Sequence, residues 1–169
     1  MKITMGIGSS FFTELSKFRA LKLVWKNLME AYEVDKNSID VHIHAVTSSF
    51  NKTLFDPHVN MLRTTTEAFS AIMGGINSLY VSPFDETFSQ PNDFSRRIAR
   101  NTQIILSEES HFSAPIDPAG GSYYVEVLTN EIAQAAWKQF KEIEKNGGMI
   151  QSLKDGRIQS SIGEMNETR

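Results

Sequence analysis

The chain has 169 residues, of which 40% are hydrophobic, and a formal net charge of −3. This length suits one compact domain with a sizeable core, and the near-neutral charge argues against a nucleic-acid-binding protein, which normally carries a basic stripe. Cysteine is absent, which excludes disulfides, thiol nucleophiles and zinc-thiolate sites. No run of about 18 apolar residues is present and the amino terminus lacks a signal-peptide pattern, so we expect a cytoplasmic protein with no membrane partner.

Short apolar strands alternate with amphipathic helices in the first half of the chain. Hydrophobic periodicity predicts, in order, a strand over 3–7, a helix over 10–33, a strand over 39–47, a helix over 57–73 and a strand over 76–82. A polar turn over 33–38 separates the first helix from the second strand. Ser9 or Ser10 can cap the first helix, and Asp56 is suited to cap the second.

Helices dominate the second half of the chain. The stretch DFSRRIARNTQIILSEESHF, residues 93–112, predicts a helix capped by Asn92 or Asp93. Its expected inner stripe consists of Phe94, Ile98, Thr102, Ile105 and Leu106. A last long helix is marked by apolar residues over 125–143, and a short helix is expected over 149–156. The polar tail over 160–169 is predicted to fray or to need a neighbour.

Strands that alternate with helices indicate parallel βαβ units and therefore an α/β fold. Three strands cannot bury both faces of a parallel sheet well. They are typical of a slice of a larger fold, such as part of a (β/α)₈ TIM barrel, for which about 200 residues is the lower limit. The chain is therefore predicted to be a partial domain. Unpaired strand edges invite pairing, so we expect it to self-associate or to require the missing part.

Two histidines, His42 and His44, fall on one face of the second predicted strand. Metal binding would need a third ligand, for which Asp56, His58 and His111 are the candidates. The favoured interpretation is that the histidines form hydrogen bonds, so no metal site is predicted. Barrel sites lie at the carboxyl ends of strands, which makes His44 the more interesting of the two.

Three further groups of residues each admit a functional and a structural interpretation. Gly6 and Gly8 can bring backbone amides near a phosphate, but a tight strand-to-helix turn is favoured. The pair Asp85–Glu86 follows a strand, where a carboxylate can accept a hydrogen bond from a ribose hydroxyl, carry a proton or cap the loop. The basic residues Arg96, Arg97 and Arg100 can bind a coenzyme A phosphate, but a solvated, ion-paired helix face is favoured.

Several blocks carry a resemblance to a known family. They are DPHVNMLRTTTEAF (56–69), SPFDETFSQPNDFSRRIARNTQIILSEES (82–110) and IDPAGGSYYVEVLTNEIAQAAWK (116–138). Together they resemble the methylmalonyl-CoA mutase family, and the similarity extends over 3–160. The resemblance implies a coenzyme A ester mutase that interconverts methylmalonyl-CoA and succinyl-CoA through adenosylcobalamin radicals. It also implies that residues 1–169 correspond to the later strands of a barrel, without the earlier strands or the cobalamin-binding domain.

The resemblance also assigns site residues. Catalytic members carry a histidine and, two positions on, a glutamine; here these positions are His44 and Val46. Ser78 and Glu86 match residues that line the family site, and the glutamate faces the adenosyl part of the cofactor. The resemblance therefore implies cofactor-binding positions at Glu86 and His44 and a substrate-binding position at Ser78. Ligand-facing positions that differ from the family pattern are Lys2, Thr4, Val46, Phe50 and Asn77.

Loss of polar contacts with retention of the framework is typical of the small, non-catalytic mutase subunit. Valine, for example, can neither donate nor accept the hydrogen bonds of a glutamine amide. We therefore expect a segment of a small subunit that supports a large catalytic subunit, and that is inactive and free of adenosylcobalamin when alone. Two alternatives stay open: a fragment of a catalytic acyl-CoA mutase, and a stand-alone binding module without catalysis.

Overall fold

The structure is a computed structural model that describes residues 1–35 and 39–167. The chain divides into two compact units, Met1–Ile132 and Ala133–Arg169, and each is described by itself. Part of the predicted polar turn, at 36–38, and the last two residues of the predicted tail lie outside the described residues. Among the residues that are described, no helix has the length and apolar character needed to cross a membrane.

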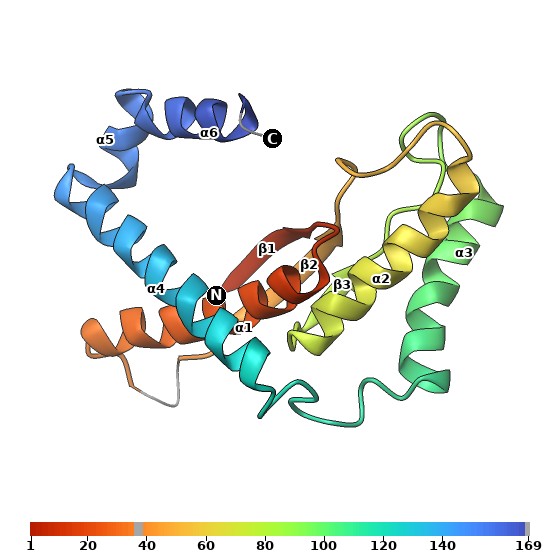
Figure 1. Cartoon of the computed structure of the whole chain (residues 1–169), viewed down its shortest axis with the longest axis horizontal. Helices are drawn as coiled ribbons and strands as arrows, with labels where there is room; N and C mark the ends of the chain where they lie inside the picture. Colours follow the sequence, from red (N-terminus) through yellow and green to blue (C-terminus); the bar gives the residue numbers. More distant parts are fainter. Residues whose placement is uncertain (36–38, 168–169) are drawn as a thin grey trace. The chain divides into compact units, whose positions relative to one another are not determined.

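The first unit is built on a parallel sheet (Figure 1), which confirms the predicted α/β class. Its strands, in spatial order, are β1 (Lys2–Ile7), β2 (His42–Thr47) and β3 (Ser78–Tyr80). The second and third strands are shorter than the predicted 39–47 and 76–82. β3 is short because, just outside its two ends, side-chain oxygens take the place of backbone carbonyls as hydrogen-bond acceptors. Ile43 N donates to Asn77 Oδ1 at 2.8 Å, and Ser82 N donates to Thr47 Oγ1 at 2.8 Å.

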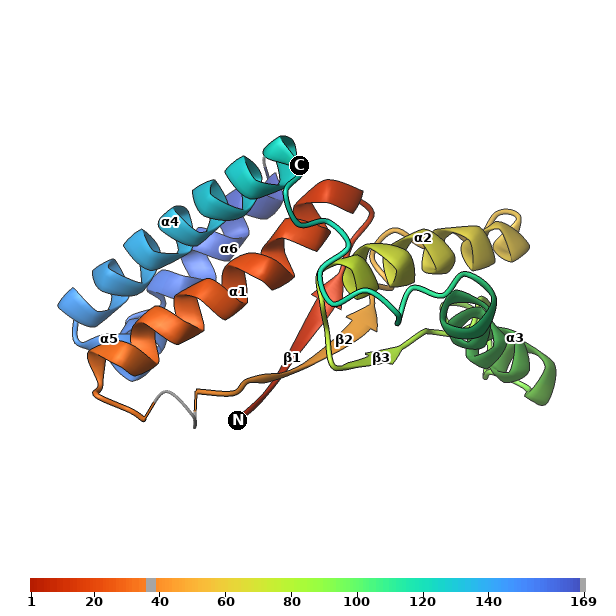
Figure 2. The same ribbon diagram turned by 90° about the horizontal axis from the view of Figure 1, so that it is seen from below.

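Two helices, α1 (Phe11–Ala31) and α2 (Asn60–Met73), cover one side of the sheet (Figure 2). Alternate strand residues pack against them, and Phe18 of α1 is fully buried in this core. The helices approach closely at Gly74, just after α2. A Cβ there would lie 2.8 Å from the Leu15 carbonyl oxygen and 2.9 Å from Phe18 Cβ. Glycine is therefore required at this position for packing.

Two of the predicted helix caps differ from the observed ones. Asp56 precedes a 3₁₀ turn, η2 (Pro57–Val59), that leads into α2. Asp56 occupies the predicted N-cap position with Pro57 as the first helical residue, but its backbone is left-handed (φ 48°) and its side chain makes no cap hydrogen bond. Ser10 does occupy the N-cap position of α1, but its hydroxyl donates to Thr13 Oγ1 at 2.9 Å and not to the helix backbone.

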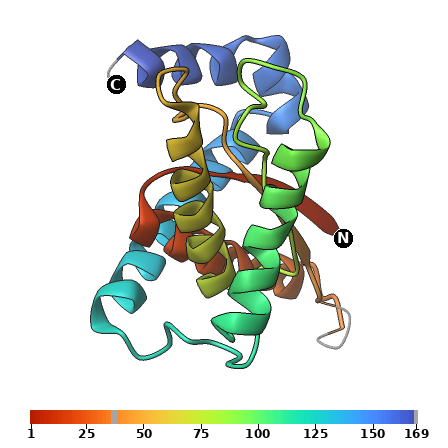
Figure 3. The same cartoon turned by 90° about the vertical axis from the view of Figure 1, so that its right-hand side faces the viewer.

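The helix α3 (Asp93–Ile104) lies beside α2 (Figure 3). Its predicted cap is confirmed, because Asn92 Oδ1 accepts from the backbone N–H groups of Phe94 and Ser95.

The predicted inner stripe of this helix is right for Leu106, which is buried, and wrong for Phe94 and Ile105, which are 50% and 46% exposed. Ile98 and Thr102 are half-buried, and Ser95 and Ala99 are the other buried residues. The segment η3 (Ile105–Glu109), which follows α3, is π-helical, and its wider turn changes which residues face inward. Phe94 instead packs edge-on against Phe84.

The second unit contains the end of α4 (Tyr123–Lys145) together with α5 (Gly148–Lys154) and α6 (Arg157–Glu167). Gly147 and Gly148 separate α4 from α5 with φ of 93° and 83°, a conformation that glycine adopts without strain. The predicted frayed tail is wrong up to residue 167, because α6 is helical there. Its apolar stripe of Ile158, Ile162 and Met165 lines a hollow within this unit, which explains why the segment is ordered as an amphipathic helix.

Substitution of Phe18 by alanine should lower the free energy of unfolding by about 3–5 kcal/mol, because a fully buried aromatic ring leaves a cavity. Urea denaturation followed by circular dichroism measures the loss. Phe12→Ala, at a ring that is 50% exposed on the same helix, is the matched control and should cost clearly less. Equal losses for the two variants would contradict the assignment of Phe18 to the core.

Candidate functional site

The side of the sheet opposite α1 and α2 carries mostly polar side chains and no covering helix of the first unit (Figure 2). Alternation along the strands places these residues on it: Lys2, Thr4, His42, His44, Val46, Ser78 and Tyr80. We call this set the helix-free face. The strand register pairs His44 with Thr4 on one side and with Ser78 on the other. Two of the predicted site residues, His44 and Ser78, are thus brought together.

One hydroxyl links the two histidines on the helix-free face. Ser78 Oγ lies 2.8 Å from His44 Nδ1 and 3.0 Å from His42 Nε2. A serine hydroxyl has one proton to donate, so at least one imidazole must donate to it. The structure therefore shows the hydrogen-bonded arrangement that was favoured over metal binding. Within residues 1–35 and 39–167, no cluster of three or more histidine, aspartate or glutamate side chains is suited to a metal ion.

Glu86 lies in the loop after β3, in a turn where its N–H donates to the Pro83 carbonyl at 3.2 Å. Its side chain is exposed, whereas the preceding Asp85 is only 3% exposed. His44 is the third of six residues in β2 and so lies in the middle of the strand. No hydrogen bond or ion pair joins His44 to Glu86 in the described part of the chain.

Tyr80 connects the sheet electrostatically with this loop and with α3. Burial raises the pKa of the Tyr80 phenol, and the negative charge of Glu86 raises it further. Arg96 opposes both effects. These influences place the phenol within electrostatic reach of one carboxylate and one guanidinium at the end of β3.

A fully buried asparagine, Asn60, ties the β2–α2 loop to the loop that carries Glu86. Its Nδ2 donates to the Thr53 carbonyl at 3.0 Å and to the Phe84 carbonyl at 3.2 Å. Its Oδ1 accepts from Thr53 N at 3.1 Å and from Arg63 Nη1 at 3.0 Å. The amide thus has both donors and both acceptor positions in use, and it fixes the backbone two residues before Glu86.

A buried ion pair holds the same β2–α2 loop against α2. Lys52 Nζ lies 2.6 and 2.7 Å from the two carboxylate oxygens of Glu67, with side-chain exposures of 4% and 1%. Burial lowers the pKa of Lys52, and the Glu67 carboxylate opposes that shift. Sequence reasoning missed Asn60, Lys52 and Glu67. A signal was present, since a glutamate at an inward position of an amphipathic helix needs a partner.

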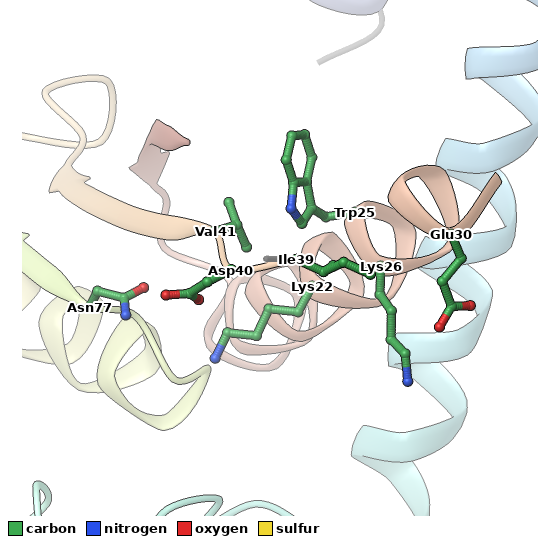
Figure 4. A pocket seen from close by; sticks show the side chains of 8 residues that line it. All are labelled: Lys22, Trp25, Lys26, Glu30, Ile39, Asp40, Val41 and Asn77. Atoms are coloured by element: carbon green, nitrogen blue, oxygen red, sulfur yellow. The ribbon is translucent and has the colours of Figure 1, made fainter. Parts of the chain in front are cut away.

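A hollow of about 470 Å³ lies at the other end of the sheet, next to the start of β2 (Figure 4). Lys22, Trp25 and Lys26 of α1 line it, together with Asp40 and Asn77. Burial lowers the pKa of Lys22, whose ammonium group donates to the Gly75 carbonyl. The sequence analysis did not predict this hollow. Two features of the sequence could have indicated it: Lys22 and Lys26 are one helical turn apart, and the polar Asp40 directly precedes β2.

Comparison with known proteins identifies the family. The family model "Methylmalonyl-CoA mutase" matches residues 1–169. The chain is 46% identical over 171 residues to the methylmalonyl-CoA mutase small subunit of Porphyromonas gingivalis, covering all of this chain and 28% of that protein. It is 46% identical over 151 residues to the small subunit of Streptomyces virginiae, covering 89% of this chain and 24% of that protein.

A further relative is the mitochondrial methylmalonyl-CoA mutase of Bos taurus, 45% identical over 153 residues, covering 89% of this chain and 20% of that protein. The fold and the helix-free face define a parallel α/β segment with a polar sheet surface. The chain belongs to the methylmalonyl-CoA mutase family. It spans between a fifth and three tenths of the length of these three relatives.

Substitution of Glu67 by glutamine should lower the free energy of unfolding by about 3 kcal/mol, because it leaves the Lys52 ammonium buried without its carboxylate. Chemical denaturation measures the change. The double variant Lys52→Met/Glu67→Met removes both charges and should recover much of the loss. A single variant as stable as the parent chain would show that the pair is not buried in solution.

Substitution of Glu86 by glutamine should lower the pKa of Tyr80, because the negative charge that disfavours the phenolate is gone. The measurement is an NMR titration of the tyrosine ring signals, with Tyr80→Phe to assign the resonance. Glu108→Gln removes a carboxylate from η3 and serves as the control. An unchanged Tyr80 pKa in Glu86→Gln would mean that Glu86 does not face the phenol.

Proposed function

We propose that this chain is a segment of a mutase small subunit that supports a catalytic subunit interconverting methylmalonyl-CoA and succinyl-CoA. The observation that carries the proposal is Val46 in the helix-free face. It is the fifth of six residues in β2, and register pairs it with Gly6 and Tyr80, so its methyl groups lie toward the carboxyl end of the helix-free face. His44 and Ser78 on this face remain hydrogen-bonded, as does Asn60 in the adjoining loops. The 46% identity to two small subunits supports the same assignment.

We also propose that residues 1–169 form the later strands of a (β/α)₈ barrel. Three features support this: the strands are parallel, α1 and α2 lie on one side only, and β1 and β3 each have a strand on one side only. In a barrel the helix-free face would turn inward and each outer strand would gain a partner.

Adenosylcobalamin is the cofactor that the family implies, and the described residues fit it poorly. Val46 offers no hydrogen bond on the helix-free face. His42 and His44 are both hydrogen-bonded to Ser78 Oγ. We therefore propose that His44, Glu86 and Ser78 occupy family ligand positions without forming a complete cofactor or substrate site in this chain alone.

A second candidate is a fragment of a catalytic acyl-CoA mutase. The retention of His44, Ser78 and Glu86 favours it, as does the 45% identity to the mitochondrial mutase. The two candidates differ in what the polar groups are for. In the small subunit they are framework, whereas in a catalytic fragment they would bind ligand once the rest of the chain is present.

The purified chain should show no mutase turnover and no saturable change in the absorbance of adenosylcobalamin. A complete catalytic mutase, such as the Bos taurus enzyme, is the positive control for both assays. A tagged copy expressed in its own host should co-purify with a larger mutase chain, identified by mass spectrometry. Stoichiometric cofactor uptake by the isolated chain would overturn the proposal in favour of the catalytic fragment.

A further inference from the structure

A hollow of about 370 Å³ lies between the end of β3 and one side of α3, separate from the hydrogen-bonded histidines of the helix-free face. Arg96, Arg100 and Gln103 of α3 line it. Their spacing of four and three residues places them in one row along the helix. Tyr80 of β3 contributes to the wall on the strand side, and Pro83 and Pro91 stiffen the rim.

Neither guanidinium in this hollow is neutralised by the protein. Among the described residues, no carboxylate lies within ion-pair distance of Arg96 or Arg100, although Asp93 is on the same helix. The ion pairs considered for Arg97 or Arg100 with acidic neighbours are thus not found among the described residues, whereas the predicted solvated face is confirmed, because Arg96, Arg97 and Arg100 are exposed. Arg97 differs from the other two, because its guanidinium lies over the Phe94 ring at 5.7 Å and outside the hollow.

The placement of the two arginines is unfavourable for the helix by itself. Like charges four residues apart destabilise a helix by about 0.2–0.5 kcal/mol. Arg96 also closes the first turn of α3, near the positive end of the helix dipole. The Asn92 side chain already accepts hydrogen bonds from the backbone N–H groups of Phe94 and Ser95 in that turn, so these N–H groups are not available to bind an anion. A bound anion between the guanidiniums would offset both penalties.

We propose that this hollow binds a phosphate group through Arg96 and Arg100. A phosphate dianion carries several acceptor oxygens and matches two guanidiniums one helical turn apart, whereas a single carboxylate carries one charge. Tyr80 and Gln103 add neutral donors on the same hollow, and the pKa of Tyr80, raised by burial, keeps its phenol protonated at neutral pH. The volume is within the range of small-ligand sites. This inference does not depend on the small-subunit proposal.

The test is an NMR titration of the full chain with inorganic phosphate at constant ionic strength, following the arginine side-chain Nε–H signals. Arg96 and Arg100 should shift together and saturate with one dissociation constant. Sodium acetate, a single carboxylate, should bind clearly more weakly at matched ionic strength. Absence of saturable shifts, or acetate binding as tightly as phosphate, would overturn the proposal.

Variants separate a specific site from general electrostatic attraction. Arg100→Gln and Arg96→Gln should each weaken phosphate binding about tenfold or more, since each removes charge-assisted hydrogen bonds. Arg97→Gln removes the same charge from the same helix outside the hollow and should leave the dissociation constant nearly unchanged. Glutamine keeps the helix propensity of arginine at these exposed positions, so folding should be preserved. Equal weakening in all three variants would contradict a defined site.

Discussion

One constraint organises the first unit: its three parallel strands are covered by helices on one side only. Successive side chains in a strand point to opposite faces, so every strand must supply an apolar set for α1 and α2 and a second set for the other side. The apolar set, with Ile7, Ile43 and Ala45, closes around Phe18. The second set is polar and includes the Ser78–histidine contacts. Core and candidate site are thus the two faces of the same three-stranded sheet.

The carboxyl end of this sheet is the most firmly tied part of the unit. Asn60 and the Lys52–Glu67 pair are buried, and both fasten the loop after β2 to α2. Asn60 also reaches the loop after β3. A chain that is to present polar groups to a ligand or a partner needs such support, because surface loops otherwise move freely. This support lies beside the helix-free face, on which Val46 is an apolar residue without hydrogen-bonding groups in its side chain.

The α/β class, the parallel strands, most helix ranges and the Asn92 cap could be predicted from the sequence. Hydrophobic periodicity and helix capping depend on residues only a few positions apart, so both can be recognised without knowledge of tertiary contacts. What the sequence could not supply depends on tertiary contacts. The π-helical η3 changes which residues of the α3 segment face inward, and Asp56 is left-handed because the chain turns sharply into η2. At the candidate site, His44 and Ser78 were identified through resemblance. Their hydrogen bond and the hydrogen bonds of Asn60 to two loops depend on the strand register and on the loop positions, which the sequence does not show.

The side-chain bonds at the two ends of β3 have a consequence for strand slippage. Asn77 exchanges two hydrogen bonds with Ile43, one through its backbone N–H and one through its side-chain oxygen, while Thr47 holds Ser82 at the far end. A shift of β3 by one residue would break all of these, at about 1 kcal/mol each, and would turn Ser78 toward the helices. A three-residue strand is normally free to adopt several registers. Here hydrogen bonds from Asn77 and Thr47 fix the register of β3 at its two ends. The geometry of the serine–histidine contacts therefore depends on two polar side chains that are not hydrogen-bonded to either imidazole.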